Sequence, residues 1–197
     1  MSKQTNAHFQ SWKTKGPLIL ENVIEYNTCL KMLSAFEQGQ PKPRTFNGLL
    51  QPEFRRADFV ILGEEFISVF EYIIKEHLES ALGVRCSMQF PHRPIIYRYP
   101  TGPGFKVHHD GVNTQEVKYA KLTGQPVMGG DITMILGIND PNDYQGGELF
   151  FPNHHLQIKF IPGMLVAYPN TEEYLHGVTP IMDGQRYSVV CRVNLLT

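Results

Sequence analysis

The stretch GFKVHHDG places His108 and Asp110 two positions apart. In an extended chain, side chains at i and i+2 lie on the same face, so His108 and Asp110 would point together and His109 would point away. The best candidate for a third ligand is His176, in YLHGVTP. Two histidines and one carboxylate on one face of a metal ion leave coordination positions open, which suits an iron(II) centre that holds a reducing cosubstrate and oxygen.

A cationic residue follows the third candidate ligand. Arg186 lies ten residues after His176, in GQRYSVVCRV, and would share a strand face with Ser188. An arginine on an otherwise apolar strand requires an anionic partner, because an unpaired buried charge is costly. Guanidinium binds carboxylate through a bidentate fork. A dicarboxylate that chelates iron at one end and contacts Arg186 at the other would account for both features.

These residues also have simpler structural explanations. A His-x-Asp tripeptide is common by chance, and a buried histidine is more often hydrogen-bonded than bound to metal. Arg55 and Arg56 are expected at the surface, although a loop near the mouth of the site could use them for substrate. Alternation along the strand predicts that Tyr97 faces the interior with Tyr99, and its simplest role is core packing.

Composition limits the class of protein. The chain has 197 residues, a net charge of -1 and 42% hydrophobic residues, which predicts a single folded domain. The near-zero charge argues against broad electrostatic capture of nucleic acid or anionic lipid. Three widely spaced cysteines predict reduced, packed thiols, and no apolar run reaches the ~18 residues of a membrane span. We therefore expect a soluble, cytoplasmic protein with no nucleic-acid or membrane partner; its oligomeric state is left open.

The hydrophobic pattern changes near residue 85. Before it, a helix is expected in the second part of 17–39, ending near Gly39, and a second helix over 64–82, with Gly83 as its stop. After it, short β-rich runs alternate with Gly/Pro turns, which favours an antiparallel barrel or sandwich. The expected layout is a mainly helical support layer over 1–85 and a β core over 86–197. The segment 111–130 has no clear period and is expected to be a covering loop.

Four stretches together resemble a known family: RYPTGPGFKVHHD, NDPNDYQGGELFFP, PGMLVAYPN and LHGVTPIMDGQRYSVVCRV. They are similar to the Fe(II)/2-oxoglutarate-dependent dioxygenases, in the prolyl 4-hydroxylase-like branch, and cover most of 97–194. The resemblance implies a double-stranded β-helix, or jelly roll, with N-terminal helices packed on one sheet. It also implies that His108, Asp110 and His176 are the iron ligands.

By the same resemblance, three further residues bind the cosubstrate. Arg186 would bind the distal carboxylate of 2-oxoglutarate, Ser188 would assist it, and Tyr99 would hydrogen-bond the same carboxylate. The cofactor would be Fe(II), with 2-oxoglutarate and O2 as cosubstrates and ascorbate as a candidate reductant. The implied reaction hydroxylates an aliphatic C–H of a peptide, protein or small molecule, most simply a prolyl group. Two alternatives stay open: a cupin-like dioxygenase that does not use 2-oxoglutarate, and a non-catalytic jelly-roll binding module.

Overall fold

The protein is described by a computed structural model that covers residues 12, 15–45, 52–89, 93–111, 122, 124 and 129–196. Most of the expected covering loop, 111–130, lies outside the described residues. The helical elements are α2 (Tyr26–Gln38), α3 (Ile67–Tyr72), η2 (Ile73–Leu78) and α4 (Glu79–Leu82), with short 3-10 turns at η1 (Glu64–Phe66), η3 (Pro141–Asp143), η4 (Pro152–His154) and η5 (Glu172–Tyr174). The strands are β1 (Leu18–Leu20), β2 (Lys42–Pro43), β3 (Asp58–Ile61), β4 (Cys86–Met88), β5 (Ile95–Gly102), β6 (Phe105–His108), β7 (Ile132–Gly137), β8 (Tyr144–Gly146), β9 (Leu149–Phe151), β10 (Leu156–Ile158), β11 (Leu165–Pro169), β12 (His176–Val178) and β13 (Ile181–Leu195).

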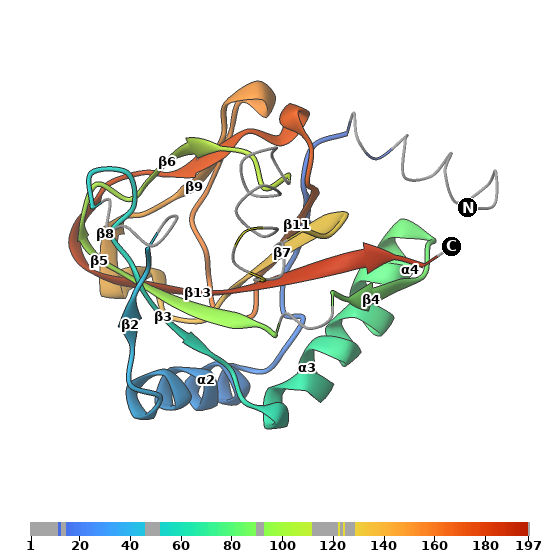
Figure 1. Cartoon of the computed structure of the whole chain (residues 1–197), viewed down its shortest axis with the longest axis horizontal. Helices are drawn as coiled ribbons and strands as arrows, with labels where there is room; N and C mark the ends of the chain where they lie inside the picture. The colour runs from blue at the N-terminus through green and yellow to red at the C-terminus, as the bar shows by residue number, and fades with distance from the viewer. Residues whose placement is uncertain are drawn as a thin grey trace.

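The strands form two antiparallel sheets. The larger sheet has the order β1-β11-β7-β13-β5-β3-β2, and β4 and β8 also pair with β13. The smaller sheet has the order β10-β9-β12-β6. In Figure 1 the smaller sheet, marked by β6 and β9, lies on one side of β13 and β5. The predicted β-rich core is confirmed, because β4 to β13 all lie after residue 85 and form most of the two antiparallel sheets.

Alternation along the strands of the larger sheet separates two cores. On β13, Val189, Cys191 and Val193 face a cluster that also contains buried side chains of α2, α3 and η2. On β5, Tyr97 and Tyr99 face the other cluster, which fills the space toward the smaller sheet. Figure 1 shows α2 and α3 along the side of the larger sheet that is turned away from β6 and β9. The interior between the sheets is therefore lined by the odd-numbered tyrosines of β5 and the even-numbered residues of β13.

The N-terminal third contains more strand than its pattern predicts. Both expected helices are confirmed: α2 is followed by Gly39, and η1 to α4 are followed by Gly83 in the left-handed conformation, at φ 65°. However, β1 pairs with β11 and β3 pairs with β5, so this part also extends the larger sheet. A mainly helical layer over 1–85 is therefore an incomplete expectation. These strands are two to four residues long, and such short runs show no readable period.

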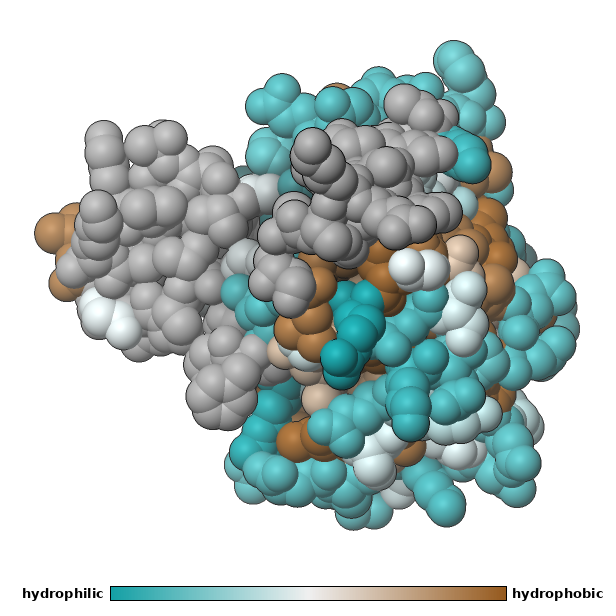
Figure 2. Space-filling model, turned by 90° about the vertical axis from the view of Figure 1, so that its right-hand side faces the viewer, coloured by the Kyte–Doolittle hydropathy of each residue, from teal (hydrophilic) through white to brown (hydrophobic). Residues whose placement is uncertain are grey.

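The surface and the thiols agree with the composition. In Figure 2, hydrophilic residues cover much of the described surface, with apolar side chains visible in patches between them. Cys29, Cys86 and Cys191 are all buried and free, as predicted. Among the residues that the structure describes, no helix is long and apolar enough to cross a membrane.

A matched pair of isoleucines tests the helix-facing core. Ile73 is fully buried, whereas Ile61 is 55% exposed. We expect Ile73→Val to lower the free energy of unfolding by about 0.5–1.5 kcal/mol, because it removes a packed methylene and leaves a cavity. Ile61→Val removes the same methylene from a largely solvated side chain and should change stability by less than about 0.5 kcal/mol. Urea denaturation of both variants measures the difference, and equal losses would contradict the assigned core.

Candidate metal centre

The two candidate histidines come from paired strands of the smaller sheet. β6 ends at His108 and β12 begins at His176, and these two residues are direct partners in the antiparallel register. Their ring centroids are 4.4 Å apart. A glycine is required where β6 begins, because Gly104 has φ 73° and a Cβ there would collide with the carbonyl oxygen of Val178. The pairing of β6 with β12 thus brings together histidines 68 positions apart in the sequence.

Asp110 completes a group of three. It follows the end of β6 by two residues, and its Oδ1 lies 3.7 Å from His108 Nε2 while its Oδ2 lies 3.5 Å from His176 Nε2. Ligand atoms of all three residues lie within 4.8 Å of one another. His109 is not in this group, and its Nδ1 accepts a hydrogen bond from the backbone N–H of Gly111. The structure therefore brings together the three residues that were singled out as ligands.

Hydrogen bonds fix which nitrogen each histidine offers. His108 Nδ1 lies 2.8 Å from the carbonyl oxygen of Lys106, and His176 Nδ1 lies 3.0 Å from that of Tyr174. A carbonyl only accepts, so each Nδ1 carries the proton and donates it. Each Nε2 is therefore unprotonated and can bind a metal ion, although in His176 it also lies 3.0 Å from the Tyr168 hydroxyl. Burial lowers the pKa of both rings, and the proximity of His176 helps to bring the pKa of His108 to about 3. Both imidazoles are neutral at physiological pH, which is the form that binds a metal.

The carboxylate of Asp110 is held by residues that the sequence did not single out. Arg192 Nη2 donates to Oδ1 at 2.7 Å, and the Tyr168 hydroxyl donates to Oδ2 at 2.9 Å. Thr133 lies 2.9 Å from the same Oδ2 and also contacts Arg192. Burial alone would raise the pKa of Asp110, but the charge of the Arg192 guanidinium and its hydrogen bond to the carboxylate outweigh burial and hold the pKa well below its ordinary value. Asp110 is therefore ionised and oriented before any metal arrives.

Arg186 lies in the same interior and has unused donors. It is 1% exposed, its Nη1 donates to Ser188 Oγ at 3.0 Å, and its cross-strand partner in the β13–β5 register is Tyr99. Arg186 Nε and Nη2 have no hydrogen-bond partner among the described residues. A buried guanidinium with free N–H groups is costly unless an anion binds it. The two imidazoles and the carboxylate of Asp110 fit a divalent metal ion. The unpartnered N–H groups of Arg186 fit a carboxylate bound in the same interior.

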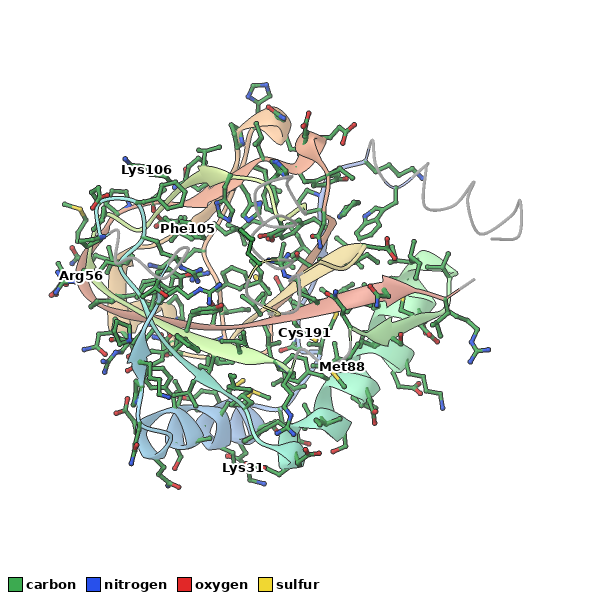
Figure 3. All side chains as sticks on the ribbon, viewed as in Figure 1. Lys31, Arg56, Met88, Phe105, Lys106 and Cys191 are labelled. Carbon is green, nitrogen blue, oxygen red and sulfur yellow. The ribbon has the colours of Figure 1, made fainter. Side chains whose placement is uncertain are left out.

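One cavity connects these groups. It has a volume of about 50 Å³, and its lining includes the three candidate ligands, Arg186, Ser188, Tyr99 and Arg192. Arg55 also lines it, so the expectation of a surface position is wrong for Arg55, whereas the alternative of a loop near the site fits. Arg55 reaches the cavity because its segment bridges to Phe105 on β6. The adjacent Arg56 is exposed, as expected, and Figure 3 shows it at the edge of the molecule.

Comparison with known sequences places the same region in one family. The sequence model described as the 2OG-Fe(II) oxygenase superfamily matches residues 94–193. A PKHD-type hydroxylase of Shewanella sp. (strain ANA-3) is 35% identical over 95 residues, which are 47% of this chain and 38% of that protein. A PKHD-type hydroxylase of Pseudomonas putida is 35% identical over 108 residues, which are 52% of this chain and 44% of that protein. The chain thus spans less than half the length of these curated relatives.

Solved structures share the fold over nearly the whole chain. A viral collagen prolyl hydroxylase from Paramecium Bursaria Chlorella virus-1, in complex with 2OG, superposes with a TM-score of 0.68 at 16% identity and covers 92% of this chain and 97% of its own. A prolyl hydroxylase from Trichoplax adhaerens, in complex with a hypoxia inducible factor peptide fragment, has a TM-score of 0.67 at 17% identity, with 98% and 89% covered. A prolyl-4-hydroxylase of Pseudomonas putida has a TM-score of 0.63 at 14% identity, with 96% and 98% covered.

Proposed function

Because the chain belongs to the 2OG-Fe(II) oxygenase superfamily, we propose that it is an Fe(II)- and 2-oxoglutarate-dependent hydroxylase with a prolyl 4-hydroxylase-like site. His108, Asp110 and His176 would hold the iron, and Arg186 would bind the distal carboxylate of 2-oxoglutarate with help from Ser188 and Tyr99. When bound, Fe(II) with 2-oxoglutarate and oxygen supplies the oxidative chemistry that hydroxylates an aliphatic C–H and releases succinate and carbon dioxide.

The single observation that carries this proposal is the buried, only partly hydrogen-bonded guanidinium of Arg186 beside the three candidate ligands. Its buried Nε and Nη2 have no partner among the described residues, and it lines the same cavity as the His–Asp–His group. A cupin-like dioxygenase that works without 2-oxoglutarate has no need of a buried dicarboxylate anchor. A binding module has no need of the ligand set, in which each histidine presents its Nε2. The pair of features therefore favours the 2-oxoglutarate-dependent reaction over both alternatives.

The chain's own residues orient the reactants and hold the protons. The two backbone carbonyls keep protons on both Nδ1 atoms, so the Nε2 atoms stay available to the metal. Arg192 and Tyr168 hold the carboxylate of Asp110 toward the centre. The apolar side chains of Ile135, Leu149 and Val178 line the same cavity and reduce the water near the reacting groups. We infer a peptide, protein or amino-acid acceptor, because the similar structures include two prolyl hydroxylases, one of them in complex with a peptide fragment.

Succinate formation tests the proposal. The purified chain is incubated aerobically with Fe(II), ascorbate and 2-oxoglutarate, first alone and then with proline-containing peptides and free amino acids. We expect succinate to form only when iron and 2-oxoglutarate are both present, and to increase with an accepted substrate. Omission of iron and the Asp110→Asn variant are the two controls. Succinate that forms equally without iron, or no succinate under any condition, would contradict the proposal.

Tyr99 gives a smaller, separate prediction. Its hydroxyl accepts a hydrogen bond from Arg55 Nη2 at 2.6 Å, which leaves the hydroxyl proton free to donate to a bound carboxylate. We expect Tyr99→Phe to raise the 2-oxoglutarate concentration for half-maximal succinate formation by about threefold to tenfold, the worth of one hydrogen bond. Tyr97→Phe, on the same face of β5, is the matched control and should change it less. Equal effects of the two substitutions would remove Tyr99 from the cosubstrate site.

A further inference from the structure

Arg55 is a second guanidinium in the cavity that the mechanism above does not use. Its segment is held against β6, since Arg55 bridges to Phe105 and the backbone N–H of Lys106 donates to the carbonyl of Phe54 at 3.1 Å. The guanidinium carbon lies 4.2 Å from the ring centroid of Tyr97 and 4.4 Å from that of Phe105. Figure 3 shows Phe105 directed inward, whereas Arg56 lies at the edge. Arg55 is therefore fixed on an aromatic wall beside the metal centre.

The position of Arg55 is close to His108. The ring of Phe105, on which Arg55 lies, has its centroid 3.8 Å from that of His108. The His108 side chain is 19% exposed, against 4% for His176, so the His108 side of the centre is the more open one. Arg186, by contrast, is 1% exposed and lies deep in the interior. The cavity thus has one guanidinium at depth, that of Arg186, and one near the more open His108 side, that of Arg55.

The charged groups that line the cavity, counted with the proposed metal ion and cosubstrate, leave an excess of positive charge. Arg186, Asp110, a divalent cation and a dicarboxylate cosubstrate together are neutral. The two other arginines of the lining, Arg55 and Arg192, are then positive charges that this set does not balance. Arg192 donates to Asp110, but no carboxylate among the described residues lies within ion-pair distance of Arg55. The buried Nε of Arg55 also has no hydrogen-bond partner among those residues. An excess positive charge in a cleft attracts an anionic ligand.

We propose that the acceptor substrate carries a carboxylate and that Arg55 binds it beside His108. This inference rests on the proposed function and deepens it by naming the substrate class. The carboxylate belongs either to a free amino acid or to a peptide, through its C-terminus or an acidic side chain. Guanidinium suits this role because its planar fork binds carboxylate in a directional way that a neutral amide does not reproduce. The structural alternative is that Arg55 serves only to position the Tyr99 hydroxyl.

Matched acids and amides test the substrate class. The probes are L-proline and L-prolinamide, Gly-Pro-Gly with a free or an amidated C-terminus, and amidated acetyl-Pro-Glu and acetyl-Pro-Gln. Succinate formation is measured with the iron-loaded wild-type chain at saturating 2-oxoglutarate. We expect at least one acid to stimulate turnover and its amide or glutamine counterpart to stimulate it at least tenfold less. The pair that shows the difference identifies the source of the carboxylate.

Two arginine variants then test whether Arg55 causes the preference for acids over their neutral counterparts. We expect Arg55→Gln to raise the half-saturating concentration of the accepted acid by about tenfold to hundredfold, the worth of a hydrogen bond to a charged group. The preference for the acid over its neutral counterpart should disappear with it. Arg56→Gln is the matched control, because Arg56 is exposed and its Nη1 donates to the backbone carbonyl of Thr101, outside the cavity. This variant should keep both the half-saturating concentration and the preference.

The outcomes separate the two levels of inference. If wild type forms no succinate even from 2-oxoglutarate alone, the proposed function fails. If succinate forms but neutral probes work as well as acids, or no acid stimulates turnover, the carboxylate inference fails while the proposed function stands. If Arg55→Gln raises the half-saturating concentration of 2-oxoglutarate and keeps the acid preference, Arg55 acts through Tyr99 and the inference is also overturned.

Discussion

Replacement of Arg186 by methionine is expected to weaken 2-oxoglutarate binding by about two to three and a half orders of magnitude, the equivalent of roughly 3–5 kcal/mol at ~1.4 kcal/mol per decade. Arg186 is 1% exposed, and its Nε and Nη2 have no hydrogen-bond partner within the described part of the chain, so both can donate to a carboxylate. Without it, the distal carboxylate would be buried with no charge partner. Metal affinity should change little, because the three ligands and the contacts of Asp110 with Arg192 and Tyr168 are retained.

The measurement is a titration of succinate formation against 2-oxoglutarate at fixed iron, for wild type and Arg186→Met. Arg98→Met is the control, because Arg98 lies on the partner strand β5 but pairs with Asp58 at 2.7 Å, outside the cavity. The half-saturating concentration of 2-oxoglutarate for Arg98→Met should match that of wild type. If Arg186→Met also matches wild type and only its melting temperature falls, Arg186 is a structural residue and the main argument for this cosubstrate is lost.

Replacement of Asp110 is expected to act in the opposite order, with metal lost first and 2-oxoglutarate binding lost as a consequence. Asp110 would be the only anionic ligand of the three, since both imidazoles are neutral. Loss of an outer hydrogen-bond partner of a metal ligand costs about 10–100-fold in affinity, and loss of the ligand itself should cost more than 100-fold. Asp110→Ala also leaves Arg192 without its carboxylate, so Asp110→Asn serves as the variant that preserves shape.

Calorimetric titration with Mn(II), followed by metal analysis after dialysis, measures this loss. Asp58→Ala is the matched control, because it removes a carboxylate that pairs with Arg98, next to Phe36 of α2 and away from the cavity. That variant should bind one metal ion with the affinity of wild type. Retention of one tightly bound ion by both Asp110 variants would show that the metal is held elsewhere.

The parts of the site that could be predicted are those with a local pattern. His108 and Asp110 are two residues apart, and Arg186 and Ser188 share a face of one strand, so period-two alternation alone pairs them. The helix over η1 to α4 was predicted for the same kind of reason, because its apolar residues repeat with the helical period and a left-handed glycine ends it.

The parts that escaped prediction depend on long-range pairing. Arg192 reads as one more residue of an apolar strand, and its partner Asp110 is 82 positions away. Arg55 reads as half of a surface Arg-Arg pair, and only its bridge to β6 turns it into the cavity while Arg56 stays outside. Strand alternation could have placed Arg192 in the cavity, because it lies on the same face of β13 as Arg186 and Ser188. All three residues line the cavity.

The most direct test of the central claim is a crystal structure of the chain grown anaerobically with Mn(II) and 2-oxoglutarate. The account predicts one metal ion bound by the Nε2 atoms of His108 and His176 and by the carboxylate of Asp110. It also predicts 2-oxoglutarate bound to that ion, with its distal carboxylate on the N–H groups of Arg186. A metal ion bound by other residues, or a 2-oxoglutarate carboxylate that does not contact Arg186, would contradict the account.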